Sequence, residues 1–331
     1  MKTVKNKAFT PLENAISFCW RESRSLRSLS LQPIRKRNSL TGFTLVEVIT
    51  AVVIIMILLS ILLPALNMVR KYAKDTQQKA QLVSIEIGIN LYKNEDCFGD
   101  YPPAGKPSTR AGTTTYYDAS QMLAEAMFGL DLLGVDPNST YTYSTNDLNN
   151  YASSASALHK RKGPYLDRTH VSVFKAKDIF SNTNYLEPEG YLICDAYTAV
   201  TKTITMNNGS SRKVKIGTPV LYYKANTGVT DINSTNPGSS IYNSIDNEDL
   251  ITLGSVAKST NYHHFDHDSA HYTKLTPSED GREFFYDYIT DPMISGTKYP
   301  LRPDSFLLIS AGYDGLYGTA DDICNFEPTL E

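Results

Sequence analysis

The sequence predicts an α+β protein in which one long N-terminal helix packs on a small antiparallel β-sheet head with long loop insertions. Three observations predict it. A 21-residue apolar run extends from Phe43 to Leu63, helical periodicity continues to about residue 92, and short strand-like runs follow residue 100. The 331 residues are 41% hydrophobic, which excludes a wholly disordered chain. The formal net charge of −3 argues against a dedicated nucleic-acid-binding protein.

The net charge of the chain changes sign at the start of the apolar run. Residues 1–42 carry nine Lys or Arg side chains against two acids, a net charge of +7, so residues 43–331 carry −10. A helix needs about 20 apolar residues to cross a bilayer, and the run is long enough. The basic residues before it are expected to stay in the cytoplasm, which places the chain after Leu63 on the outer side. The alternative is a buried helix of a soluble protein, but such helices rarely run this long without polar residues.

An ordinary secretory signal is a second alternative. Its apolar core is usually about 7–15 residues long and is followed by a cleavage site of small residues, and neither feature is present here. Instead, the residues Gly42-Phe43-Thr44-Leu45-Val46-Glu47 resemble the processing site of type IV prepilins and type II secretion pseudopilins. In that family a prepilin peptidase cuts after the Gly and methylates the new N-terminal Phe. The resemblance therefore implies a type IV pilin-like fold, cleavage after Gly42, a methylated Phe43, and residues 1–42 as a basic leader that is long for the family.

Glu47 is the only charged residue in the apolar run. A carboxylate inside a spanning helix costs about 2.5–3.5 kcal/mol on insertion scales, so it needs a partner or a function. In the family, the implied partner is the free amine of Phe43 on a neighbouring subunit, a pairing that sets the register during filament assembly. The alternative is that Glu47 lies near enough to the membrane interface to reach water. The resemblance favours the assembly role.

The helical pattern continues past Pro64, at a position where family members commonly kink. We expect a transmembrane or filament-core helix over residues 43–66 and an amphipathic continuation over residues 67–94 that packs on the head. At 1.5 Å per residue, the helix from Phe43 to about Tyr92 would be about 75 Å long. The residues that recur at steps of three and four are Val69, Ala73, Thr76, Ala80, Val83, Ile87 and Leu91.

Residues 95–331 predict an α+β head. Asp118 and Gln121 are placed to cap a short helix from Ala119 to Phe128. The strand-like runs are Gly190–Cys194, Val200–Met206, Lys213–Ile216, Val220–Tyr223 and Ser305–Ile309. Residues 207–210, Asn-Asn-Gly-Ser, predict a hairpin turn between the second and third runs. Two stretches rich in Ser, Thr, Asn and Tyr, residues 138–156 and 226–247, predict long surface loops.

An acidic loop, residues 310–326, follows the last of these strands. It resembles the calcium loop of type II secretion major pseudopilins, whose pattern is Ser-x-Gly-x-Asp-Gly, a Gly-rich stretch, and then Asp-Ile-x-Asn. The resemblance implies side-chain oxygens from Asp314, Asp321 and Asp322 and carbonyl oxygens from Ala311 and Leu316. Calcium takes six to eight such oxygens, and three uncompensated charges favour a structural calcium ion. The alternative is an acidic turn in which the Asp residues serve only as turn formers.

Weaker signals leave other chemistry open. His263, His264, His267 and His271 could supply zinc ligands, although a polar loop is the favoured interpretation and metal binding stays undecided. Cys97, Cys194 and Cys324 would remain after processing and allow one disulfide of unknown pairing. The sequence has no nucleotide-binding or hydrolase motif, so we expect no enzyme and name no catalytic residue.

The resemblance implies a structural subunit of a type II secretion or related type IV filament system. It would be exported as a prepilin and anchored by one helix in the bacterial inner membrane, with its head on the periplasmic side. The implied partners are a prepilin peptidase, identical or related pilin subunits and the inner-membrane platform of the secretion system. Two alternatives remain: an adhesion or binding protein that uses the same export route, and a membrane-anchored metal-dependent hydrolase built on the histidines. The secreted cargo and the choice between a major and a minor subunit stay open.

Overall fold

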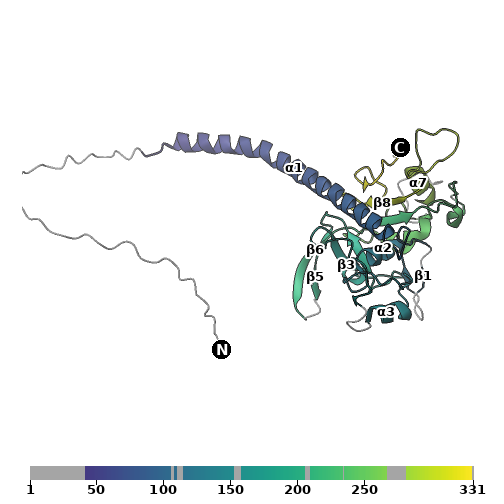
Figure 1. Cartoon of the computed structure of the whole chain (residues 1–331). Coiled ribbons are helices and arrows are strands. Elements are labelled where there is room, and N and C mark those ends of the chain that lie inside the picture. Colours follow the sequence, from purple (N-terminus) through teal and green to yellow (C-terminus); the bar gives the residue numbers. More distant parts are fainter. Residues whose placement is uncertain are drawn as a thin grey trace, which may run out of the picture. The chain divides into compact units, whose positions relative to one another are not determined.

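A computed structural model of the chain describes residues 42–105, 108–109, 115–152, 158–205, 209–233, 235–266 and 281–329. The chain divides into two compact units, residues 1–58 and residues 59–331, and each is described by itself. Helix α1 (Leu45–Lys93) contributes residues to both units (Figure 1). Among the described helices, α1 is the one that is long and apolar enough to cross a membrane.

The described part of the first unit, residues 42–58, is helical from Leu45 onward, and its side chains are exposed. The helix begins in a reciprocal capping box. The Glu47 carboxylate accepts hydrogen bonds from the Thr44 N–H and the Thr44 hydroxyl, each at 2.8 Å. The Glu47 N–H in turn donates to the Thr44 hydroxyl oxygen at 3.2 Å. This arrangement satisfies N–H groups that have no partner inside the helix.

In the second unit, α1 changes from an exposed to a half-buried helix. Its side chains are exposed as far as Ala73. Its buried residues are Gln78, Gln81, Leu82, Ile85, Gly88, Ile89 and Tyr92. The predicted continuation of the helix is confirmed, but the recurring apolar stripe lies on the other side: Val69, Val83, Ile87 and Leu91 are 51–64% exposed.

Close packing decides which face of α1 is buried. A Cβ atom at Gly88 would lie 2.9 Å from Leu166 Cδ2, so the absence of a side chain brings the helix close to the head. Gln81 Nε2 donates to the carbonyl oxygen of Cys194 at 2.7 Å, which satisfies a polar group that burial would otherwise penalise. Neither the close approach at Gly88 nor the hydrogen bond of Gln81 can be inferred from the positions of the apolar residues.

In the described part of the head, short helices accompany four small sheets. All strand pairs among the described residues are antiparallel: β1 (Ser108–Thr109) with β2 (Tyr116–Tyr117), β3 (Ser172–Lys175) with β4 (Tyr191–Cys194), β5 (Val200–Thr205) with β6 (Ser211–Ile216), and β7 (Leu221–Lys224) with β8 (Phe306–Ser310), which also pairs with β9 (Ile323–Cys324). The helices are α2 (Ala119–Phe128), α3 (Thr145–Ala152), α5 (Ala176–Ile179), α6 (Glu248–Ile251), α7 (Gly281–Tyr288) and the 3₁₀ turns η1 (Pro237–Ser239) and η2 (Ser244–Asn247). The predicted α+β class is confirmed.

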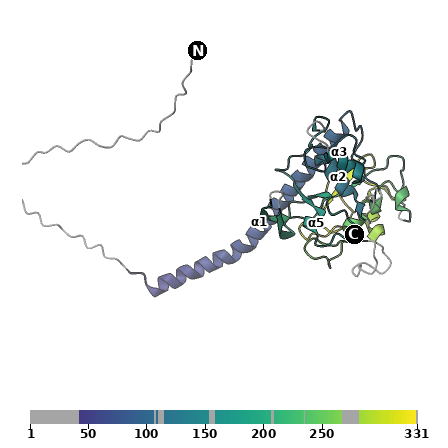
Figure 2. The same cartoon turned by 90° about the horizontal axis from the view of Figure 1, so that it is seen from below.

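The β7–β8 pair lies between two apolar clusters. Tyr222 and Leu308 belong to one cluster, with Ile85 of α1 and Met127 of α2. Their strand neighbours Leu221, Tyr223, Leu307 and Ile309 belong to the other cluster, with residues of α7. Alternate residues of a strand point to opposite faces, so this sheet forms a middle layer. Helix α2 lies beside the C-terminal end of α1 in both views (Figures 1 and 2).

The predicted helix over residues 119–128 is confirmed, but its predicted cap is wrong. Asp118 occupies the N-cap position and makes no side-chain cap hydrogen bond. Its Oδ2 accepts the N–H of Leu250 at 2.8 Å instead. Gln121 Nε2 donates to the carbonyl oxygen of Glu187 at 2.8 Å. Both side chains are buried, so tertiary partners replace the local ones.

The two predicted surface loops are also corrected. Residues 138–156 contain helix α3, and Tyr141, Tyr143 and Tyr151 are buried. The Asp147 carboxylate accepts hydrogen bonds from backbone N–H groups and hydroxyls of residues 140–144, which satisfies this polar segment internally. Residues 226–247 contain η1 and η2 and bury Ile241 and Tyr242. Tyrosine supplies apolar area here despite the polar composition.

Candidate functional site

Gly42 and Phe43, the predicted processing residues, lie immediately before α1. Apart from Gly42 itself and its two chain neighbours, no atom lies within 4 Å of the position that a Cβ atom of Gly42 would take. The fold therefore does not require glycine there. The Phe43 side chain is 86% exposed. Both residues on either side of the predicted cleavage bond are thus exposed.

Glu47, the predicted assembly residue, lies in the first turn of α1 and is exposed. Its partner within the chain is Thr44, through the capping box described above. This partner was not predicted, although the spacing Thr-x-x-Glu before an apolar run is a capping-box signal. The carboxylate thus has a local role in starting the helix in addition to any contact with another subunit.

Two of the three predicted carboxylate ligands of calcium, Asp314 and Asp321, are in contact. Asp321 Oδ2 accepts the N–H groups of Tyr313 at 2.7 Å and Asp314 at 3.0 Å. Its Oδ1 accepts the Thr319 hydroxyl at 2.8 Å. The carboxyl groups of Asp314 and Asp321 lie close enough to influence each other's pKa. The loop therefore folds around Asp321.

Asp322, the third predicted carboxylate, faces another set of partners. Its Oδ2 accepts the N–H of Gly318 at 2.7 Å and the hydroxyl of Tyr288 at 2.9 Å. Its Oδ1 lies 3.4 Å from the Thr319 hydroxyl, which also donates to Asp321. Thr319 thus bridges the second and third carboxylates.

The pKa values of these carboxyl groups differ. Burial raises the pKa of Asp322 to about 7, although hydrogen bonds from Gly318 and Tyr288 oppose the shift. Burial also raises the pKa of Asp314, and the negative charge of Asp321 adds to the effect. At Asp321, burial acts in the same direction but is outweighed by the hydrogen bonds that it accepts, so its pKa is lowered. Hydrogen bonds stabilise the charged form of all three carboxyl groups, but they outweigh burial only at Asp321.

Two glycines bring the arms of this loop together. Gly312 has φ of +62° and Gly318 has φ of +90°, in the left-handed region that favours glycine. A Cβ atom at Gly312 would lie 2.1 Å from the carbonyl oxygen of Asp321. At Gly318 it would lie 2.6 Å from Cβ of His264. Side chains at these positions would separate the segments that carry the carboxylates.

The potential ligand atoms near the loop are of the type that calcium prefers. They are all oxygens: three carboxylates, the Thr319 hydroxyl and the predicted backbone carbonyls of Ala311 and Leu316. Within the described part of the chain, however, no group of three or more His, Cys, Asp or Glu side chains is arranged to hold a metal ion. Asp322 would have to turn away from Tyr288 for all three carboxylates to meet at one ion.

His263 has a structural role that the sequence analysis missed. It is buried, and its Nδ1 accepts the N–H of Tyr317 at 3.1 Å. Its ring also hydrogen-bonds to the backbone of Gly254, and burial lowers its pKa to about 3. The N–H of His264 donates to the carbonyl oxygen of Tyr317 at 2.9 Å. These contacts fasten the acidic loop to the head, while the predicted candidates His267 and His271 lie outside the described residues.

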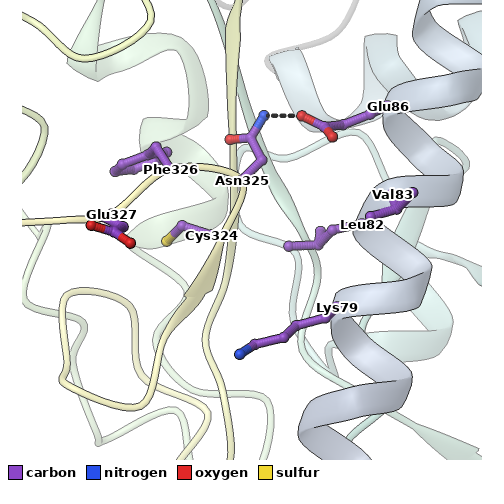
Figure 3. A pocket seen from close by; sticks show the side chains of 8 residues that line it. All are labelled: Lys79, Leu82, Val83, Glu86, Cys324, Asn325, Phe326 and Glu327. Atoms are coloured by element: carbon purple, nitrogen blue, oxygen red, sulfur yellow. Dashed lines mark hydrogen bonds between the residues drawn. The ribbon is translucent and has the colours of Figure 1, made fainter.

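The end of the acidic loop contacts α1 along a groove of about 380 Å³ (Figure 3). One side is formed by α1 and the other by residues 324–327. Asn325 Nδ2 donates to Glu86 Oε1 at 2.9 Å, and Arg302 forms an ion pair with the same oxygen at 2.7 Å. The loop is therefore connected to the buried half of α1. Cys324 lines the groove as a free thiol, and Cys97 and Cys194 are also unpaired, so no disulfide joins these three cysteines.

The comparisons with known proteins bear on the N-terminal region. Residues 37–63 match the family described as the prokaryotic N-terminal methylation motif, and this range includes Gly42, Phe43 and Glu47. The chain has no match among curated proteins or solved structures. The motif and the apolar helix support an exported, membrane-anchored, pilin-like subunit that is processed by a prepilin peptidase and assembles with other pilin subunits. The chain thus carries, at residues 37–63, the hallmark motif of type IV prepilin- and pseudopilin-like proteins.

Proposed function

We propose that this protein is a structural subunit of a type II secretion or related type IV filament system, cleaved after Gly42 and assembled through the first half of α1. The observation that carries the proposal is the uncovered apolar helix directly after the methylation motif: every side chain from Gly42 to Ala73 is exposed. An apolar surface of this extent needs a membrane or a partner to cover it. A bilayer before assembly and neighbouring helices after assembly would do so.

Gly42 supports cleavage at this bond. The fold has room for a side chain at this position, so folding does not explain the glycine. Recognition by a peptidase that needs the smallest residue before the cut does explain it. Phe43 is exposed and would become the N-terminal residue of the mature chain.

The outer face of α1 supports assembly beyond the membrane segment. Val83, Ile87 and Leu91 lie one turn apart on the exposed side of the half that packs on the head. This stripe would extend the contact between subunits from the apolar half of the helix. The further partner in the proposal is the inner-membrane platform, with the head on the outer side of the membrane.

Calcium at the acidic loop is the second part of the proposal. Asp314, Asp321 and Asp322, with the carbonyl oxygens of Ala311 and Leu316, would hold the ion. Bound calcium would supply the positive charge that the loop lacks. Since Asn325 and Arg302 both contact Glu86, ordering of the loop would also strengthen its attachment to α1.

Processing can be tested by co-expressing the full chain with a prepilin peptidase and measuring the intact mass of the membrane fraction. We expect a product that begins with N-methylated Phe43. Gly42→Leu should remain at precursor mass. Gly105→Leu is the matched control, because a Cβ atom there also meets nothing within 4 Å, and it should be processed like the wild type. A mature N-terminus elsewhere, or normal processing of Gly42→Leu, would contradict the proposal.

Calcium binding can be tested by thermal unfolding of the full chain in detergent with calcium or a chelator. The melting temperature of the wild type should rise with calcium, because the ion binds the folded loop only. Asp321→Asn should lose most of this rise. Asp231→Asn, at an exposed acid outside the loop, should keep it. Equal melting temperatures of the wild type in calcium and chelator would exclude a structural ion.

A further inference from the structure

Positive charge is concentrated in two segments of the second unit. Residues 70–79 of α1 contain four basic side chains and one acid, and residues 200–216, the β5–β6 hairpin, contain four basic side chains and no acid. The basic residues are Arg70, Lys71, Lys74, Lys79, Lys202, Arg212, Lys213 and Lys215. Together these segments carry +7, whereas residues 43–331 carry −10 in total, so the rest of that span carries −17.

The two basic segments are joined by direct contacts. Lys74 Nζ donates to the carbonyl oxygen of Ala196 at 2.7 Å, and the Ala196 N–H donates to Gln78 Oε1 at 2.7 Å. The Tyr197 hydroxyl is hydrogen-bonded to Asp75. Residues 195–199 lead directly into β5, and the N–H of Ala199 pairs with the carbonyl oxygen of Ile216 at 2.9 Å. The base of the hairpin is therefore held beside residues 74–78 of α1 (Figure 1).

This position is close to the end of the apolar part of α1. Within the second unit, exposed apolar side chains continue through Leu66, Met68 and Val69, and Arg70 follows directly. Residues 74–78 lie about 8–14 Å further along the helix axis at 1.5 Å per residue. The strands of the hairpin, about 20 Å long at 3.3 Å per residue, start at that level.

One face of the hairpin is wholly polar and exposed. In the β5–β6 register, Thr201 lies opposite Lys215, Thr203 opposite Lys213 and Thr205 opposite Ser211, and all six side chains are exposed. The other face is partly buried, and Lys202 on that side donates to the carbonyl oxygen of Ile179. Among the described strands, the hairpin pairs with no further sheet. It thus presents two neighbouring lysines among hydroxyl groups, a set of donors that suits phosphate oxygens.

We infer that the exposed face of the β5–β6 hairpin docks on anionic phospholipid headgroups, beside Arg70 and Lys71 at the end of the apolar part of α1. The inference rests on the proposed function, because it requires the chain to be anchored in a membrane. Basic side chains within about 10 Å of an anionic surface are attracted to it. The remainder of the head, residues 95–331 without the hairpin, carries −16 and is repelled by the same surface, which leaves the hairpin as the side that can approach it.

The test uses the full chain reconstituted at one copy per nanodisc, in phosphatidylcholine alone or mixed with phosphatidylglycerol. Hydrogen exchange of the β5–β6 amides, measured by mass spectrometry, should be several-fold slower in the anionic discs. High salt should remove the difference, because it screens exposed charges. Lys213→Gln combined with Lys215→Gln should also remove it. Lys258→Gln, at an exposed lysine outside both segments, should not.

Three outcomes would overturn the inference. Equal exchange of the wild-type hairpin in both kinds of disc would show that its charge does not contact lipid. The measurement is repeated with two copies per disc, and protection that follows the number of copies, and not the lipid, would assign the surface to a second copy. Failure of the chain to enter either disc would overturn membrane anchoring, and with it both the proposed function and this inference. Unchanged exchange of the β7–β8 amides in the double variant would show that its fold is intact.

Discussion

The two halves of helix α1 share one backbone and differ in what covers them. The first half, from Leu45 to Val69, contains one charged residue, and the chain buries none of its side chains. The second half buries a stripe that includes Gln78, Gln81 and Gly88. The most apolar part of the protein is thus the part that its own fold leaves uncovered. The difference indicates that the first half is built for an environment outside the chain.

The two halves are also specified in different ways. In the second half, directional contacts fix the helix against the head, such as the hydrogen bond from Gln81 to the Cys194 carbonyl oxygen and the close approach at Gly88. The first half presents apolar side chains all round. A helix that is apolar on every side suits lipid or a ring of identical neighbours, because either can cover it in any rotation.

The largest expected effect separates the two halves directly. Ile85→Ala removes a fully buried side chain and leaves a cavity, so the free energy of unfolding of the head should fall by about 2–5 kcal/mol. Ile57→Ala makes the same chemical change at a side chain that is 56% exposed, and should change that free energy by less than about 0.5 kcal/mol. Denaturant unfolding of the processed chain in detergent, followed by tyrosine fluorescence, measures both.

A similar loss from the two variants would break the comparison, since it would mean that the head also depends on the first half of the helix. Tyrosine fluorescence is a usable signal because the only tryptophan of the chain, Trp20, lies within residues 1–42, which the proposed cleavage removes. A processed chain therefore reports through tyrosines, many of which are buried in the head.

A smaller effect is expected in the pH dependence of stability, where Glu125 of the head is compared with Glu47 of the first half of α1. Burial raises the pKa of Glu125 to about 7, against hydrogen bonds from Ser139 and Tyr117 that lower it. In the unfolded chain the pKa returns to 4.5. Between these values only the unfolded chain has lost the proton, so this contribution to stability is complete below pH 4.5 and is lost as the pH rises to 7. The slope is at most about 1.4 kcal/mol per pH unit.

Glu125→Gln should remove this slope from the pH profile of unfolding. Glu47→Gln, at the carboxylate of the exposed half, should leave the profile of the head unchanged. The informative quantity is the difference between the wild-type and variant profiles, because other groups of the head also titrate. If stability depended on pH in the same way in Glu125→Gln and in the wild type from pH 4.5 to 7, the raised pKa of Glu125 would be contradicted.

Features set by local sequence could be predicted. The limits of helix α2, five of the strands and the apolar helix follow from periodicity and turn residues. The N-terminal motif was readable because it is continuous and lies beside the apolar run, and the family match over residues 37–63 includes it. Non-local packing could not be predicted. Asp118 has the position and chemistry of a cap, but the folded chain brings the Leu250 N–H to it instead.

The acidic loop shows the same limit within one site. Its glycines and aspartates identify a tight acidic turn, and Asp314 and Asp321 do meet. Asp322 faces Tyr288, which is distant in sequence, and His263 binds the loop backbone from another segment. Neither contact has a spacing that a sequence pattern could reveal. The Thr44–Glu47 capping box, in contrast, has a recognisable spacing, Thr-x-x-Glu, and could have been predicted from the sequence.

The smallest expected effect tests that capping box. Thr44→Ala removes the hydroxyl that exchanges hydrogen bonds with Glu47, and loss of a cap costs about 0.5–2 kcal/mol. Hydrogen exchange of the amides of residues 45–48, measured in detergent, should therefore become faster. Thr50→Ala is the matched control, because the Thr50 hydroxyl donates to carbonyl oxygens inside the helix and caps nothing. Equal exchange in the two variants would mean that the Glu47 carboxylate does not need Thr44 to start the helix. A partner outside the chain would then be the one remaining reason for a carboxylate in the apolar run.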